Sequence, residues 1–326
     1  MPFLHRQIES FSELGAPVMF GTNVGQDFLK EFKQNLITLS DQNATLELLS
    51  FMGNSYSKKF FEEIKPYLKK FKQIKRVVIN DCFTQRKDDM LESLDHIVEG
   101  IEGKGVFAFD ISNNAIAQNG CERLSKYFES NKDLQYLYAD NIGLSQTAVP
   151  IFCDSLKLGK PPLKLLSLNR NKIETTANVI GDLISHLPTL QDFSIAANSI
   201  RQDDEDCEQC MSILLQEIAK LKFLERLNVS DNFIDEGAFE FMLKIIEGCE
   251  DLKDLNISDS NLSEDMNEKL IDSLKLSTKN WERFSHNFNE LYDDDQKIEM
   301  LTELMKSGKF VYFSLLGCDI YEEDDF

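Results

Sequence analysis

Residues Leu134–Leu144 read LQYLYADNIGL, and this stretch decides the fold. Its apolar residues Leu134, Leu137 and Ala139 stand at the first, fourth and sixth positions of a short extended run. Strand side chains alternate between the two faces of a sheet, so the apolar set is expected to face a core. The intervening polar and aromatic residues then face outward, where a binding partner would meet them first.

The same pattern, LxxLxLxxN, recurs ten times when other apolar residues replace Leu and Cys, Ser or Ile replaces Asn. The stretches between matches hold apolar residues three or four apart, as in Phe60, Ile64 and Leu68, which is typical of helices. A strand and a returning helix in each unit predict an α/β leucine-rich repeat solenoid, a horseshoe of about ten repeats. Helices are wider than strands, so parallel strands should line the concave face and helices the convex face. The matches begin 27 to 34 residues apart, at Leu46, Ile74, Val106, Leu134, Leu163, Leu190, Leu224, Leu252, Trp281 and Phe310.

The expected division of the chain is an N-terminal helical cap over 1–45, a repeat domain over 46–320 and a short acidic tail over 321–326. The cap is inferred from the amphipathic stretch Asp27–Leu39, whose apolar residues fall at helical spacing. A solenoid without a cap would leave one end of its core open to water, so terminal units are atypical.

Two insertions, Phe83–Asp89 and Arg201–Cys210, lengthen the period and are expected to form loops along one edge. The second contains Cys207 and Cys210, but no second pair and no nearby histidine completes a metal site. The seven cysteines are an odd number scattered over the chain, which is typical of reduced thiols in a reducing compartment.

Composition restricts the kind of partner. The formal net charge is -21, from 56 acidic and 35 basic residues, which opposes binding to nucleic acid or to an anionic membrane. The sequence begins without an apolar run of signal-peptide length, and no window is long and apolar enough for a membrane span. We therefore expect a soluble, intracellular monomer that binds another protein.

The ninth position of the repeat explains much of the asparagine content. A buried amide there can satisfy backbone groups that lose their partners as the chain leaves the strand, so these residues are interpreted as structural. They are Asn54, Asn114, Asn171, Asn198, Asn232 and Asn289.

The eighth position is mostly polar and would form a row along one rim of the solenoid. Such a row can be polar simply because loop edges are wet, or because it contacts a partner. Its members are Asp81, Asn113, Asn141, Arg170, Ala197, Asp231 and Asp259.

No self-contained catalytic site is expected. The four histidines lie in different repeats, and the chain has no phosphate-binding loop, no dinucleotide-binding glycine motif and no metal-ligand cluster. If the protein accelerates a reaction, the reaction takes place in the active site of a partner.

The run LQYLYADNIGL, followed by PPLKLLSLNRNKIE, with FTQRKDD upstream and LNVSDNFIDEGA downstream, resembles the RanGAP family. These are GTPase-activating proteins of the small GTPase Ran. The resemblance extends from about Leu46 to near the C-terminus, in the same order and at similar spacing. It implies Asn141 and Arg86 as the catalytic residues. The candidate partner-binding residues are Asn113, Arg170, Asp231 and Asp259.

The resemblance also implies a mechanism. Such a protein stimulates hydrolysis by Ran in its GTP state without inserting an arginine finger. Asn141 would contact a tyrosine of Ran and help to hold Ran's own catalytic glutamine against the attacking water, while Arg86 would act as a contact and orienting residue. The chain would need no cofactor of its own, because GTP and Mg²⁺ would be bound by the GTPase. The expected location is the cytoplasm, including the cytoplasmic side of the nuclear envelope, with a Ran-binding protein as an additional partner.

Three departures from the family pattern leave an alternative open. Ile142 replaces the usual ninth-position residue and is expected to change how Asn141 is supported. Ala196 and Ala197 stand where polar residues are usual, and the acidic tail is short. The alternative is a non-catalytic leucine-rich repeat adaptor or structural component of a larger protein assembly. A third reading, binding of a basic enzyme in the manner of ribonuclease inhibitor, leaves Arg86 and Asn141 unexplained.

Overall fold

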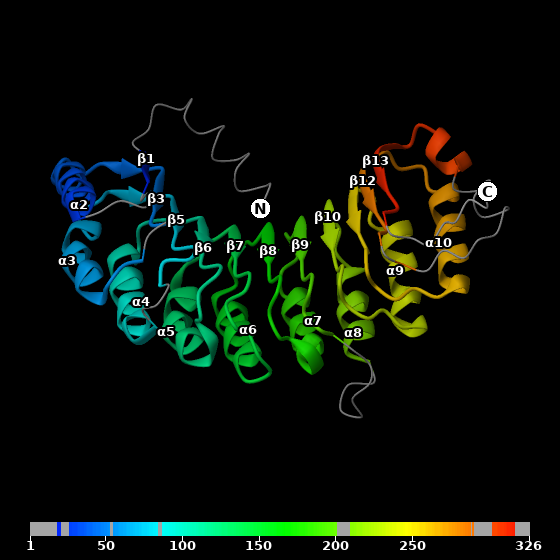
Figure 1. The fold of residues 1–326 in the computed structure, drawn as a ribbon, viewed down its shortest axis with the longest axis horizontal. Helices are drawn as coiled ribbons and strands as arrows, with labels where there is room; N and C mark the ends of the chain where they lie inside the picture. The colour runs from blue at the N-terminus through cyan, green and yellow to red at the C-terminus, as the bar shows by residue number, and fades with distance from the viewer. Residues whose placement is uncertain are drawn as a thin grey trace, which may run out of the picture.

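The computed structural model describes residues 18–20, 26–52, 55–83, 87–200, 209–287, 289 and 302–316. Strands and helices alternate to form a crescent, with the strands along the concave edge and the helices along the convex edge (Figure 1). Eleven strands make one sheet, in the order β1-β3-β5-β6-β7-β8-β9-β10-β11-β12-β13. Every neighbouring pair is parallel. The α/β leucine-rich repeat solenoid predicted from the sequence is therefore confirmed.

The bounds of the elements follow the repeat. The strands of the main sheet are β1 (Val18–Phe20), β3 (Leu48–Ser50), β5 (Arg76–Val78), β6 (Ala108–Asp110), β7 (Tyr136–Tyr138), β8 (Leu165–Ser167), β9 (Asp192–Ser194), β10 (Arg226–Asn228), β11 (Asp254–Asn256), β12 (Trp281–Ser285) and β13 (Phe310–Ser314). A small parallel sheet pairs β2 (Thr45–Leu46) with β4 (Gln73–Ile74). The helices are α2 (Gln26–Asp41), α3 (Lys58–Leu68), α4 (Lys87–Ile101), α5 (Ala117–Ser130), α6 (Ala148–Gly159), α7 (Ala177–Ser185), α8 (Cys210–Ile218), α9 (Glu236–Gly248) and α10 (Glu264–Leu276).

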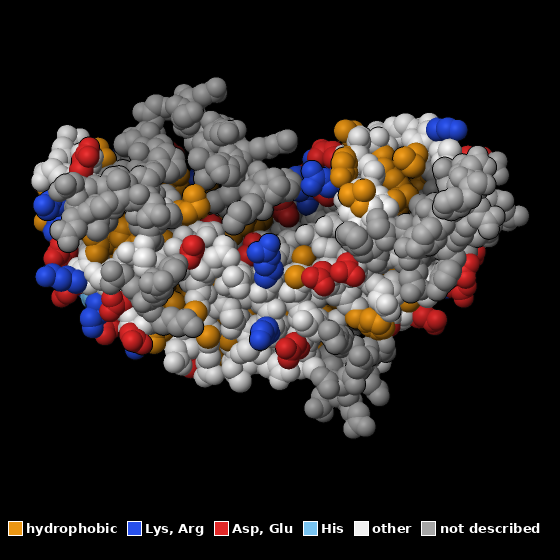
Figure 2. All heavy atoms as spheres, in the orientation of Figure 1, with side chains coloured by type: hydrophobic (Ala, Val, Ile, Leu, Met, Phe, Trp, Pro, Cys, Tyr) orange, Lys and Arg blue, Asp and Glu red, His pale blue; other side chains and the backbone are white. Residues whose placement is uncertain are grey.

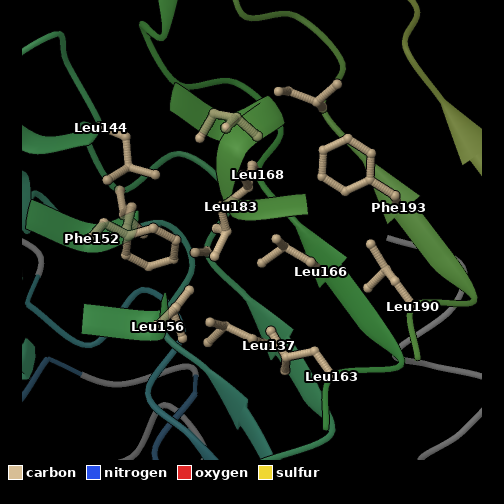
Figure 3. Close-up of a cluster of buried hydrophobic side chains, with 14 of the residues drawn as sticks. Leu137, Leu144, Phe152, Leu156, Leu163, Leu166, Leu168, Leu183, Leu190 and Phe193 are labelled. Carbon is tan, nitrogen blue, oxygen red and sulfur yellow. The ribbon is translucent and has the colours of Figure 1, made fainter. Parts of the chain in front are cut away.

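The core lies between the sheet and the helices, and equivalent residues of successive repeats stack in it. Leu137 of β7 pairs in register with Leu166 of β8, which pairs with Phe193 of β9. All three are fully buried, and Figure 3 shows them against Phe152 and Leu183 of the helical layer. Burying one such side chain contributes about 1.5–3 kcal/mol, so the repeated apolar positions hold the crescent together.

The ninth-position asparagines have the structural role predicted for them. Asn171 Nδ2 donates to the backbone oxygens of Ala139 and Leu168, at 2.9 Å each, and Asn171 Oδ1 accepts from the backbone N–H of Ile142 at 3.0 Å. Equivalent bonds to backbone carbonyls are made by Asn114, Asn198, Asn232 and Asn289. Asn54 lies outside the described residues.

The N-terminal region adds a strand that the sequence pattern did not indicate. Helix α2 covers the amphipathic stretch expected to be helical, but β1 precedes it and pairs in parallel with β3. The division into cap, repeat domain and tail stays a prediction, and the tail at 321–326 lies outside the described residues. None of the helices in the described ranges is both long enough and apolar enough to span a membrane.

The first insertion was expected to be a loop throughout, and this is wrong for its last three residues. Helix α4 begins at Lys87 and carries Asp88 and Asp89 in its first turn, where negative charge is favoured by the helix dipole. The last residue of the second insertion, Cys210, is likewise helical, because it begins α8. Residues 84–86 and 201–208 of the two insertions lie outside the described residues.

The cysteines also depart in one place from the expectation of reduced thiols. Cys82, Cys121, Cys153 and Cys249 are free and buried, as expected. Cys210 is disulfide-bonded.

Candidate functional site

The eighth-position row has one backbone conformation throughout. Every member has a positive φ, between 51° and 58°, which places it in the left-handed region. Asparagine and aspartate adopt this region more readily than other residues with a side chain. Their frequency at this position therefore has a conformational cause, which the repeat pattern alone did not reveal. The row consists of Asp81, Asn113, Asn141, Arg170, Ala197, Asp231 and Asp259.

Two members of the row are of residue types that do not favour the left-handed region. Arg170 has φ 56° and Ala197 has φ 57°, and a left-handed residue of either type costs roughly 1–2 kcal/mol. Ala197 is half-buried and presents no polar group, whereas the Arg170 side chain is exposed at the rim. A strained residue with an exposed charged side chain is the stronger candidate for partner contact.

Asn141 lies on the rim with its side chain exposed. Its backbone N–H donates to the oxygen of Asn169 in the next repeat at 2.7 Å. Ile142, expected to alter the support of Asn141, is fully buried, and its N–H is satisfied by Asn171 of the next repeat. Support for this corner of the fourth repeat is thus supplied from its neighbour, and the Asn141 side chain stays at the surface.

A chain of side-chain hydrogen bonds leads from Asn141 into the concave face. Asn141 Nδ2 donates to Asn113 Oδ1, Asn113 Nδ2 donates to Asn80 Oδ1, and Asn80 Nδ2 donates to Asp110 Oδ2, each at 3.1 Å. Asp110 is buried, and its Oδ1 accepts the backbone N–H of Ser112 at 2.9 Å.

Sequence reasoning missed Asn80 and Asp110 as members of the site. Asp110 gives a local signal, because it is a carboxylate within the otherwise apolar strand AFD. Asn80 gives none, since its role depends on how three repeats stack. Of the residues predicted for the site, Asn113 and Asn141 are joined by this chain of bonds.

The other predicted residues are spread along the rim. Arg170, Asp231 and Asp259 are exposed members of the same row, in three separate repeats. Arg86 lies outside the described residues. On the face shown in Figure 2, basic and acidic side chains lie next to one another along the middle of the molecule, and apolar side chains gather near the C-terminal strands.

The concave face is hollowed into a groove of about 410 Å³. The carboxylates of Asp110, Asp192 and Asp254 line it, and burial raises the pKa of each. Arg226 Nε donates to Asp192 Oδ2 at 2.8 Å, which opposes the rise for that carboxyl. Asp192 is thus paired with Arg226 of the neighbouring strand, and amides and hydroxyls line the groove beside the carboxylates, so the groove presents a mixed polar surface.

Two further buried titratable groups are His286 and Cys121. His286 Nε2 lies 2.7 Å from Asn267 Oδ1, and burial lowers the pKa of His286 to about 4. Burial raises the pKa of Cys121 to about 12, so this thiol stays protonated. Within the described ranges no group of three or more His, Cys, Asp or Glu side chains could hold a metal ion. The chemistry offered by the rim is hydrogen bonding by amides and contact by charged groups.

The fold and its polar rim define the chain as a leucine-rich repeat solenoid of the α/β type. In comparisons with known proteins, no family model matches the sequence. The chain is 28% identical over 198 residues to Ran GTPase-activating protein 2 of Caenorhabditis elegans. That match covers 56% of this chain and 20% of the relative, so the chain corresponds to about a fifth of that protein's length.

A comparison with solved structures finds the crystal structure of a TLR13-ssRNA13 complex. The TM-score is 0.36 with 16% sequence identity, over 79% of this chain and 41% of the other.

Proposed function

We propose that this protein stimulates GTP hydrolysis by the small GTPase Ran, with Asn141 acting on Ran's own catalytic machinery and no arginine finger. The observation that carries the proposal is the placement of Asn141, an exposed amide held at the rim by the backbone of the next repeat and by Asn113. The sequence similarity to a Ran GTPase-activating protein supports the choice of GTPase.

An amide suits this task. It donates and accepts hydrogen bonds without titrating, so it can orient a neighbouring group at any physiological pH. Positioning and electrostatics supply most of the acceleration in phosphoryl transfer, and an activator can therefore work through one well-oriented contact. GTP and Mg²⁺ belong to the GTPase in this scheme. The activator is a cytoplasmic monomer, and its partner is Ran in the GTP state.

The remaining rim residues would bind the partner. Arg170, Asp231 and Asp259 are exposed in the same row as Asn141, so one docked surface could reach several of them. Arg86 enters the proposal through the FTQR motif alone, as a contact and orienting residue.

Single-turnover GTP hydrolysis by purified Ran tests the proposal, with the wild type compared with Asn141→Gly. Glycine suits φ 51°, so this change removes the amide without straining the backbone. Losing one oriented transition-state contact should cost on the order of 2–4 kcal/mol, a rate loss of roughly 30- to 1000-fold.

Ala197→Gly is the matched control for that experiment. It changes the same position of another repeat, with φ 57°, and removes no polar group. Its stimulation of Ran should equal that of the wild type. The proposal is wrong if the wild-type protein does not accelerate hydrolysis by Ran.

A second candidate function is a non-catalytic adaptor in a larger protein assembly. Ala197 favours it, because this residue breaks the polar row where a partner contact would be expected. The adaptor would bind a stable partner whatever the nucleotide state of any GTPase. Binding assays with Ran loaded with GDP or with a non-hydrolysable GTP analogue separate the two functions, since an activator should prefer the GTP-like form.

A further inference from the structure

The hydrogen bonds between Asn141 and Asp110 form a chain with a direction. Each of the three amides donates from its Nδ2 to the next residue inward, and Asn113 and Asn80 each accept at Oδ1 from the residue outward. Four residues from three repeats take part, in the order Asn141, Asn113, Asn80 and Asp110. We call this set the rim relay.

The chemistry of the inner end fixes that direction. Both side-chain oxygens of Asp110 accept hydrogen bonds, Oδ1 from the backbone N–H of Ser112 and Oδ2 from Asn80, so Asn80 turns its NH₂ group toward Asp110. Its oxygen then faces Asn113, which must also donate inward. The same reasoning applies once more to Asn141, whose carbonyl oxygen is left without a donor among the described residues.

We propose that Asp110, acting through Asn80 and Asn113, is the positioning residue that presents the carbonyl oxygen of Asn141, rather than its NH₂ group, to the partner. The role in GTP hydrolysis rests on the function proposed above. The partner group that meets Asn141 would then be a hydrogen-bond donor, such as a hydroxyl or an amide.

The variant Asp110→Asn should reverse the relay without changing its shape. The backbone N–H of Ser112 points at the Oδ1 of residue 110, at 2.9 Å, and can only donate. The introduced amide therefore keeps its oxygen on Ser112 and turns its NH₂ group toward Asn80. Every later link must then flip, and Asn141 would present its NH₂ group outward.

A double variant restores the original direction. Asp110→Asn combined with Asn113→Asp moves the carboxylate to the middle of the relay, where it accepts from Asn80 on one side and from Asn141 on the other. Aspartate tolerates the left-handed backbone of this position, where φ is 58°. The carbonyl oxygen of Asn141 faces outward again, and the net charge is the same as in the wild type.

Side-chain amide NMR tests the relay without a partner. In the wild type the NH₂ groups of Asn141 and Asn113 are both hydrogen-bonded. In Asp110→Asn the Asn141 amide protons should exchange with water about fivefold faster, as expected when one hydrogen bond is lost. The Asn113 amide should stay protected, because it donates in either direction, and the double variant should restore protection of Asn141.

Single-turnover hydrolysis by Ran tests the consequence. Asp110→Asn should lower the maximal rate about tenfold with little change in half-saturating concentration, the result expected when a transition-state contact is lost. The double variant should regain the wild-type rate. Asp254→Asn removes another groove carboxylate whose pKa is raised by burial, and it should leave the rate unchanged. Urea unfolding establishes that each variant is folded.

The outcomes separate the two proposals. The relay is overturned if Asp110→Asn leaves the Asn141 amide protected, or if the wild type stimulates Ran and Asp110→Asn does so equally well. If the wild type fails to stimulate Ran, the proposed function fails, and the amide exchange of the three proteins still decides the relay.

Discussion

The side chain of Asn171 reaches back into the preceding repeat, where its Oδ1 accepts the backbone N–H of Ile142 at 3.0 Å and of Leu144 at 3.1 Å. The fourth repeat has an isoleucine where its neighbours have an asparagine. The N–H groups of its turn are bonded by the asparagine of the fifth repeat, just as the N–H of Asn171 is bonded by Asn198 of the sixth at 3.1 Å. Asn171 supports the segment that carries Asn141, so the candidate site depends on two repeats at once.

Asn171→Ala should destabilise the protein by about 3–5 kcal/mol, because several buried backbone groups would lose their partner together. The free energy of unfolding in urea measures the change. Lys172→Ala alters the adjacent exposed residue and should change stability by less than about 0.5 kcal/mol. A loss below 1 kcal/mol for Asn171→Ala would contradict the structural role of this amide.

Ala197→Gly should stabilise the fold by about 1 kcal/mol, because glycine relieves the strain of a left-handed alanine. The shift in thermal unfolding midpoint measures the effect. Ala139→Gly is the comparison: Ala139 is buried at the sixth position without a positive φ, so this change should destabilise instead. Equal effects of the two substitutions would argue against strain at Ala197.

The buried His286 predicts how stability depends on pH. An unfolded histidine takes up a proton below about pH 6.5, whereas the folded His286 stays neutral down to about pH 4. The unfolded state binds more protons between these values, so the free energy of unfolding falls as the pH is lowered from 6.5 to 4, by about 3 kcal/mol in total.

His286→Gln should remove this contribution while keeping a donor for Asn267. The groove carboxylates have the opposite effect on stability. Burial raises the pKa of Asp110, Asp192 and Asp254, so the folded state takes up their protons first, and this raises the free energy of unfolding as the pH falls. Their contribution cancels when variant and wild type are compared at each pH. Parallel stability curves for the two proteins between pH 6.5 and 4 would contradict the prediction.

Leu137→Ala should lower the free energy of unfolding by about 2–5 kcal/mol, because Leu137 is fully buried and packs against stacked neighbours of two repeats. The midpoint of urea unfolding measures the change. Leu158 is 67% exposed, so Leu158→Ala should have an effect below about 0.5 kcal/mol. Similar losses for both would mean that the core does not rest on the repeated strand positions.

Much of the fold could be predicted because the same pattern of strand and helix residues recurs in each repeat. Leu134, Leu137 and Ala139 are fully buried, as their spacing indicates, and the ninth-position asparagines bond the backbone as their chemistry suggests. Strand β1 was missed because VMF is too short to carry a period of its own, and pairing with β3 decides its conformation.

The candidate site was only partly predictable. The eighth-position row could be read from the sequence, but its left-handed backbone, which favours Asn and Asp for conformational reasons, could not. The rim relay depends on which amide lies beside which after stacking. Asn80 and Asn113 are 33 residues apart in the chain and 3.1 Å apart between Oδ1 and Nδ2. The spacing of residues along the sequence does not predict this contact.

The pairing of each strand with only the strands of adjoining repeats has a mechanical consequence. A small change in the angle between successive units accumulates along the crescent, so its two tips can move apart while each local interface changes little. The crescent should therefore be elastic, opening or closing slightly as a whole. The curvature at its centre, where Asn141 lies, can adjust to a rigid surface at low energetic cost.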